Sequence, residues 1–123
     1  MSAYNFQARF APAVASGQKR QTIRRLRKSG RRHALPGEAL QLYTGYGSSL
    51  AYKLVEPDPT CLSVDPVSII KVDDDVQVLV RDEPLSLLEL ERLARADGFD
   101  NIRLFLLFFV ESGLPFEGVL IKW

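Results

Sequence analysis

The sequence predicts one domain over residues 1–123, of the α+β class and built mostly from strands. Most apolar runs are short and lie between turn-forming Gly and Pro residues, as expected for strands. One segment, Ser86–Asp97, instead has the spacing of an amphipathic helix. A chain of 123 residues is also long enough to bury a hydrophobic core.

The N-terminal part predicts a short helix followed by a strand. Pro12 suits a first helical turn, which places the helix over residues 11–16, and Gly17 can adopt the left-handed backbone that ends it. The next strand is expected over Gln21–Arg24, because Thr22 and Ile23 are β-branched. Alternation along a strand then turns Thr22 and Arg24 to one face and Ile23 to the core.

Further strands are expected along the middle and the end of the chain. They cover residues 39–44, 50–55, 61–72, 76–80 and 118–123, with a hairpin turn at residues 73–75. Residues 102–110 are nearly all apolar, which favours a central strand covered on both faces. In the predicted helix, Ser86 and Glu89 have the spacing of a capping box, and Gly98 ends the apolar stripe.

Composition favours an ordinary globular protein in the cytoplasm. Hydrophobic residues make up 46% of the chain, and the longest apolar run, Leu104–Val110, is far below the ~20 residues of a membrane span. The N-terminus has no basic-apolar leader, so we expect no secretion and no membrane partner. Cys61 is the only cysteine, so an internal disulfide is excluded and a buried structural thiol is expected.

Charge is distributed unevenly along the chain. Residues 1–60 contain ten basic and three acidic residues, a net charge of +7, whereas residues 61–123 contain six and twelve, a net charge of −6. Eight basic residues and no acid lie between Lys19 and Arg32, and residues 25–34 are expected to form an exposed loop. Such a cluster favours phosphate contact over the alternative of a solvated loop.

The sequence gives little indication of a metal or a cofactor. His33 is the only histidine and is expected in the loop, without the three or four ligands that a metal needs. The acidic run at residues 73–75 lacks the spacing of a calcium loop. Tyr43 just before, and Tyr46 within, the flexible loop of residues 44–49 are candidates for stacking on bases.

A short motif in the basic region resembles a known family. Gly17-x-Lys19-x-x-Thr22-x-Arg24 is similar to the G-x-K-x-x-E-x-R signature of ASCH domains, with Thr22 in place of the glutamate. It resembles more closely the G-x-K-x-x-T-I-R motif of small bacterial amidohydrolases that deacylate N4-acetylcytidine, since Ile23 also matches. The resemblance implies a PUA-like β-barrel with a short N-terminal helix and one longer helix near residues 86–97.

The resemblance also implies catalytic residues. Lys19 and Thr22 match the motif, and Glu83 stands just before the long helix, where that branch has a catalytic glutamate; Asp82 competes for this place. Thr22 can attack an amide only if a base takes its proton. Lys19 can do so if desolvation, or positive neighbours such as Arg20 and Arg24, lower its pKa.

We therefore expect recognition of RNA or of a modified nucleoside or nucleotide, with hydrolysis of N4-acylated cytidine as the candidate reaction and no cofactor. The expected substrate or RNA contacts are Arg24, Arg20, Arg25, Arg27 and Tyr43. The alternatives are a non-catalytic RNA-binding module, an ASCH-type single-stranded RNA ribonuclease and a protein-binding regulator that uses the basic loop. The sequence leaves the oligomeric state open.

Overall fold

The computed structural model describes residues 2–28 and 30–123. The elements in chain order are β1 (Ser2–Phe6), α1 (Ala11–Ser16), β2 (Gln21–Arg25), β3 (Leu40–Thr44), β4 (Tyr52–Lys53), β5 (Ser63–Val72), β6 (Asp75–Val80), β7 (Glu83–Pro84), α2 (Leu87–Ala96), α3 (Ile102–Ser112) and β8 (Phe116–Lys122). None of the helices in these ranges is long and apolar enough to cross a membrane.

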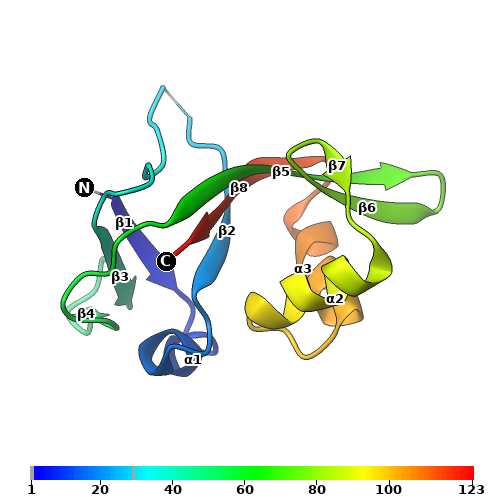
Figure 1. The fold of residues 1–123 in the computed structure, drawn as a ribbon. Helices are drawn as coiled ribbons and strands as arrows, with labels where there is room; N and C mark the ends of the chain where they lie inside the picture. The colour runs from blue at the N-terminus through cyan, green and yellow to red at the C-terminus, as the bar shows by residue number, and fades with distance from the viewer. Residues whose placement is uncertain (1, 29) are drawn as a thin grey trace.

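The strands form two sheets (Figure 1). The smaller sheet has the order β1-β3-β4, with β1 parallel to β3 and β4 antiparallel to it. The larger sheet has the order β2-β8-β5-β6-β7, and all of its pairs are antiparallel. The fold is thus α+β and mostly sheet, and the strands of residues 2–28 and 30–123 do not form a closed barrel.

The prediction of a central strand at residues 102–110 is wrong, because this segment is α3. Asn101 caps the helix: its side-chain oxygen accepts a hydrogen bond from the Leu104 amide at 2.9 Å. Phe105 and Phe109, four residues apart, are buried on one helical face. Leucines and a valine occupy part of the exposed face, so the polar stripe that identifies an amphipathic helix is weak.

Several other elements agree with the prediction. α1 covers the predicted residues, α2 carries the Ser86–Glu89 capping box in full, and β5 and β6 form the expected hairpin. The strand expected over residues 50–55 is reduced to the two residues of β4, since Leu50 remains 80% exposed and has no core to face.

The aromatic core connects the helices to the large sheet. Phe99 packs edge-on to Phe10 and Phe105, and Phe109 continues the row to Phe116 on β8. This row holds the C-terminal end of α2 and the inner face of α3 against the segment between β1 and β2. In Figure 1, α1, which belongs to that segment, lies at the lower left, across from α2 and α3.

Candidate functional site

A cavity of about 160 Å³ opens where the end of β1, the start of β2 and the end of α2 meet α3. Its polar walls come from Asn5, Gln7, Lys19, Thr22, Arg24 and Asp97, and its apolar walls from Phe6, Phe10, Ile23, Phe99, Phe108 and Phe109. Three of the sequence-predicted site residues, Lys19, Thr22 and Arg24, therefore line one cavity.

A buried ion pair lies on one wall of the cavity. Lys19 Nζ donates to the Asp97 backbone oxygen at 2.5 Å and to Asp97 Oδ1 at 3.2 Å. Gln21 Nε2 also donates to Oδ1, at 3.3 Å. Oδ2 receives no hydrogen bond from residues 2–28 and 30–123, although Asp97 is only 5% exposed. This oxygen and the third ammonium hydrogen are the polar groups that the pair can offer to a ligand.

Burial shifts the pKa values of both partners toward their neutral forms. Desolvation lowers the pKa of Lys19, and the attraction of Asp97 only partly opposes it. Desolvation likewise raises the pKa of Asp97 against the effect of Lys19 and Gln21. A lysine and an aspartate shifted in this way are suited to exchange a proton with a bound group.

Thr22 and Arg24 form the second polar wall. They are two residues apart on β2 and face the same side, as the alternation of a strand requires. Arg24 Nε donates to Thr22 Oγ1 at 2.9 Å, and Nη2 donates to the Asn5 backbone oxygen at 2.7 Å. A cationic donor on the hydroxyl oxygen favours the deprotonated alcohol.

The end of α2 places Asp97 beside Lys19. Asp97 is the C-terminal cap residue of α2, and Gly98 follows it with φ 98°. A Cβ at Gly98 would lie 3.0 Å from Phe10 and 3.3 Å from the Lys19 side chain, so the close approach needs glycine. The Lys19 ammonium on a terminal carbonyl also complements the negative end of the helix dipole.

The structure does not bring Glu83 to this cavity. Glu83 lies on β7, at the opposite edge of the large sheet from β2, and is exposed. The carboxylate in the cavity belongs to Asp97, at the other end of the helix that Glu83 precedes. Sequence reasoning missed Asp97, although an acid at a helix C-terminus is itself unusual because it opposes the dipole.

The other expected contacts are divided among different places. Arg20 folds back onto the Gly17 backbone oxygen, with Nε at 3.2 Å. Arg25 Nη2 donates to the backbone oxygens of Ser112 and Gly113 at the end of α3, so its charge is turned away from the cavity. Tyr43 packs against Tyr46, with ring centroids 5.1 Å apart.

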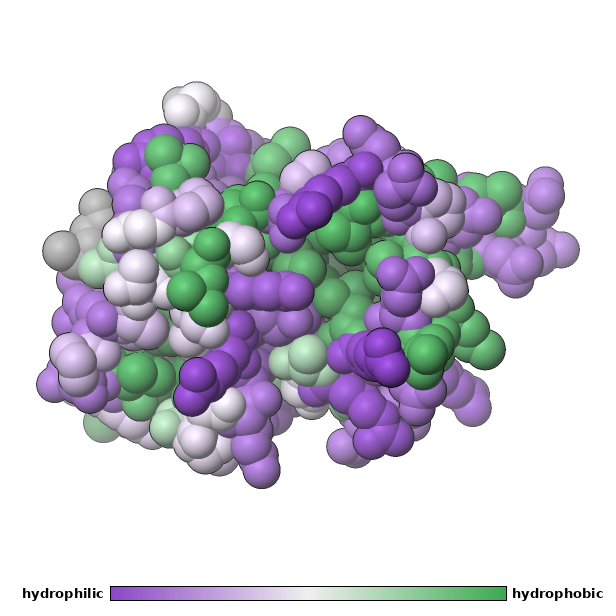
Figure 2. All heavy atoms as spheres, viewed as in Figure 1, coloured by the Kyte–Doolittle hydropathy of each residue, from purple (hydrophilic) through white to green (hydrophobic). Residues whose placement is uncertain are grey.

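Arg27 lies on a second recess, which we call the basic shelf. The shelf has a volume of about 920 Å³ and is lined by Ser2, Ala3, Arg27, Lys28, Arg31, Arg32 and Tyr46. Figure 2 shows hydrophilic residues gathered over the segment between β2 and β3, at the upper left of the molecule. Arg32 is neutralised by Glu38 at 2.7 Å, and this hydrogen-bonded pair lowers the pKa of Glu38 to about 2.

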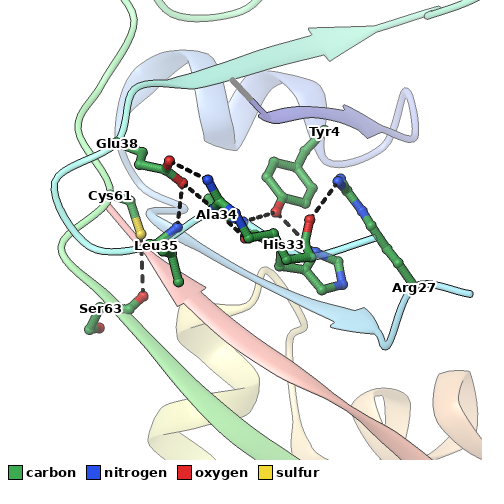
Figure 3. Close-up of polar contacts among 9 residues, drawn as sticks. Tyr4, Arg27, His33, Ala34, Leu35, Glu38, Cys61 and Ser63 are labelled. Carbon is green, nitrogen blue, oxygen red and sulfur yellow. Dashed lines mark hydrogen bonds and ion pairs between the residues drawn. The ribbon is translucent and has the colours of Figure 1, made fainter. Parts of the chain in front are cut away.

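Tyr4 and His33 tie this segment to β1 (Figure 3). The Tyr4 hydroxyl lies 3.0 Å from His33 Nδ1 and accepts from the Ala34 amide at 3.1 Å. His33 Nε2 lies 2.8 Å from the Arg25 backbone oxygen, which can only accept, so Nε2 carries the hydrogen. The neutral ring therefore accepts the Tyr4 hydroxyl hydrogen at Nδ1, and desolvation lowers the pKa of His33.

Other reactive groups of the described chain give no second centre. Cys61 is buried, donates weakly to the Ser63 backbone oxygen, and has its pKa raised by burial, as expected of a structural thiol. Residues 2–28 and 30–123 contain no cluster of His, Cys, Asp and Glu suited to a metal ion. Comparisons with protein-family models, curated proteins and solved structures found no match to this chain.

Proposed function

We propose that the protein is an amidohydrolase of the ASCH type that removes the acyl group from N4-acylated cytidine. The observation that carries the proposal is the convergence of Lys19, Thr22, Arg24 and Asp97 on one cavity with aromatic walls. Aromatic walls suit a planar base, and the polar groups suit the chemistry of an exocyclic amide. The sequence motif supports the roles of the first three residues, and the geometry adds Asp97 in place of Glu83.

In the proposed reaction Thr22 Oγ attacks the carbonyl carbon of the amide. Its proton passes to the neutral amine of Lys19, while Arg24 stabilises the oxyanion that develops on the substrate. The C–N bond then breaks as Lys19 returns the proton to the leaving amine of cytidine. The acyl group remains as an ester on Thr22, and water hydrolyses this ester to release the carboxylic acid and restore the hydroxyl.

Asp97 positions Lys19 and balances its charge when the amine holds the transferred proton. A general base contributes about 10²- to 10⁴-fold to such rates. Lys19 Nζ donates both to Asp97 Oδ1 and to the Asp97 backbone oxygen. In Asp97→Asn the backbone oxygen still accepts from Lys19, but the negative charge that balances the protonated amine is lost. We therefore expect Asp97→Asn to lower kcat more than it changes KM.

The test is to incubate the purified protein with N4-acetylcytidine and to measure released cytidine and acetate. Thr22→Ala should abolish turnover and leave nucleoside affinity within a few-fold, because it removes an interaction of the transition state. Thr60→Ala, an exposed threonine outside the cavity, serves as the matched control and should turn over normally. Absence of turnover by the wild type, alongside measurable nucleoside or RNA affinity, would favour a non-catalytic binding module.

A further inference from the structure

The cavity and the basic shelf are joined along β1. Asn5 lines the cavity and Ala3 lines the shelf, and these alternate residues of β1 share one face of the strand, roughly 7 Å apart. Asn5 Oδ1 accepts from the Tyr46 amide at 2.8 Å, which fixes the shelf tyrosine to the cavity wall. In Figure 1, β1 runs from the segment between β2 and β3 to the end beside α1.

Positive charge continues along the same path. The guanidinium groups of Arg24 and Arg27 lie 5.4 Å and 5.2 Å from the centroid of the one Tyr4 ring. Arg24 belongs to the cavity and Arg27 to the shelf, so a cation of each site contacts the same buried ring. Lys28 and Arg31 extend the charge, and neither side chain forms a hydrogen bond or ion pair within residues 2–28 and 30–123.

The shelf also offers an exposed ring. Tyr46 is 61% exposed and is supported by Tyr43 beneath it. An aromatic face next to a row of cations is the combination that single-stranded nucleic acids use, since bases stack on the ring and phosphates contact the charges. A free nucleoside carries no phosphate and would leave the shelf unused.

We propose that the ligand is a single-stranded nucleic acid, with one base in the cavity, its backbone across Arg27, Lys28 and Arg31, and a neighbouring base stacked on Tyr46. This inference rests on the proposed function for the base in the cavity and names the polymer to which that base belongs. Phosphate contacts position the strand, and the cavity selects the base.

The test measures binding of an eight-nucleotide single strand, as RNA and as DNA of the same sequence, from low to moderate salt. The Lys28→Ala/Arg31→Ala variant is compared with Lys71→Ala/Arg103→Ala, which removes the same charge from exposed residues outside the shelf. Each lost phosphate contact should flatten the log–log salt slope by about 0.7, so the shelf variant should change it by about 1.4 and the control should not. Equal slopes for the two variants would overturn the proposal.

Tyr46→Ala separates a nucleic-acid strand from a general polyanion. Loss of stacking on one base should weaken strand binding roughly 5- to 150-fold. Inorganic polyphosphate, which has no bases, should bind Tyr46→Ala as it binds the wild type. An equal affinity of the wild type and Tyr46→Ala for both single strands would overturn the proposal.

The two proposals fail in different ways. Strand binding with a salt slope set by the shelf, but no deacylation, would reject the amidohydrolase and keep the strand. A different result would reject the strand and keep the enzyme: the free nucleoside and an acylated cytidine inside the strand are deacylated with the same kcat/KM. In that case Lys28→Ala/Arg31→Ala would leave both kcat/KM values unchanged. A higher kcat/KM within RNA than within DNA would assign the polymer as RNA.

Discussion

Lys19 and Asp97 show how one residue pair can serve both the fold and the site. Both side chains are almost fully buried, at 4% and 7% exposure, so their attraction acts in a medium of low dielectric constant. A buried pair need not stabilise a protein relative to apolar residues of similar size. The pair does make the two residues depend on each other, because removal of either one leaves the other charge buried without a partner.

This dependence predicts strongly non-additive stabilities. Lys19→Met and Asp97→Leu should each lower the free energy of unfolding by about 3–5 kcal/mol, because each leaves an uncompensated buried charge. The double variant should be more stable than either single variant. Denaturant unfolding of the four proteins measures the coupling, and additive losses would show that the pair does not act as a unit.

The environment of His33 gives a prediction on pH dependence. Burial and the charges of Arg27 and Arg24 lower its pKa, so the unfolded chain binds this proton more readily than the folded one. The contribution of neutral His33 is therefore complete above its unfolded pKa of about 6.5 and is lost as the pH falls below it. Between pH 7.5 and pH 5, the wild type should lose more unfolding free energy than His33→Gln.

The comparison with His33→Gln is needed because Asp97 titrates with the opposite sign. Its folded pKa is raised, so its contribution to stability falls as the pH rises. Denaturant unfolding of both proteins is measured at the two pH values. The contribution of Asp97 is the same in both, so it cancels when their changes in unfolding free energy are subtracted. An identical pH dependence of the two proteins would mean that protonation of His33 does not affect the Tyr4 contact.

At the scale of elements, the sequence predicted correctly those helices and strands that are specified by neighbouring residues. α1, β2 and α2 were all predictable, because proline, β-branched residues and a capping box act over a few neighbours. α3 was not, because an apolar run of this kind has no clear period. Its length and the cap at Asn101 were the signals that favoured a helix.

The candidate site was predictable only within one continuous segment. Lys19, Thr22 and Arg24 lie within six residues, so strand alternation sufficed to bring them together. Asp97 comes from the far end of a helix and meets Lys19 across 78 positions. Such a pairing depends on tertiary packing, and the position of Glu83 relative to the helix could not replace it.

Gly98 gives the prediction at this scale. Gly98→Ala should lower the unfolding free energy by about 1–3 kcal/mol for the left-handed backbone alone. Gly37→Ala is the matched control, since Gly37 has a similar φ of 91° but no atom within 4 Å of the added Cβ. Only Gly98→Ala should also weaken nucleoside binding, because its Cβ displaces Phe10 and Lys19. Equal binding by both variants would show that the end of α2 does not shape the cavity.

At the scale of the molecule, the structure separates basic residues that look alike in the sequence. Eight of them form one cluster along the chain, yet Lys19 is buried in an ion pair, Arg32 is neutralised, and Lys28 and Arg31 lie on the shelf. Charge counts therefore overstate the surface available to an anion. Two substitutions that each remove one positive charge from this cluster should therefore differ in their effects on stability and on strand binding.

Arg25 and Arg31 test this division. Arg25 on β2 bonds two backbone oxygens at the end of α3, and its guanidinium lies 4.7 Å from the centroid of the Phe116 ring on β8. Arg25→Ala should therefore lower the unfolding free energy by about 1 kcal/mol, given the worth of exposed charged hydrogen bonds and cation–π contacts. The salt slope of strand binding by Arg25→Ala should stay unchanged.

Arg31→Ala should do the reverse, flattening the slope by about 0.7 with no loss of stability. Denaturant unfolding and a salt titration of the two variants decide the matter, and a weaker salt slope for Arg25→Ala would place that residue on the shelf after all.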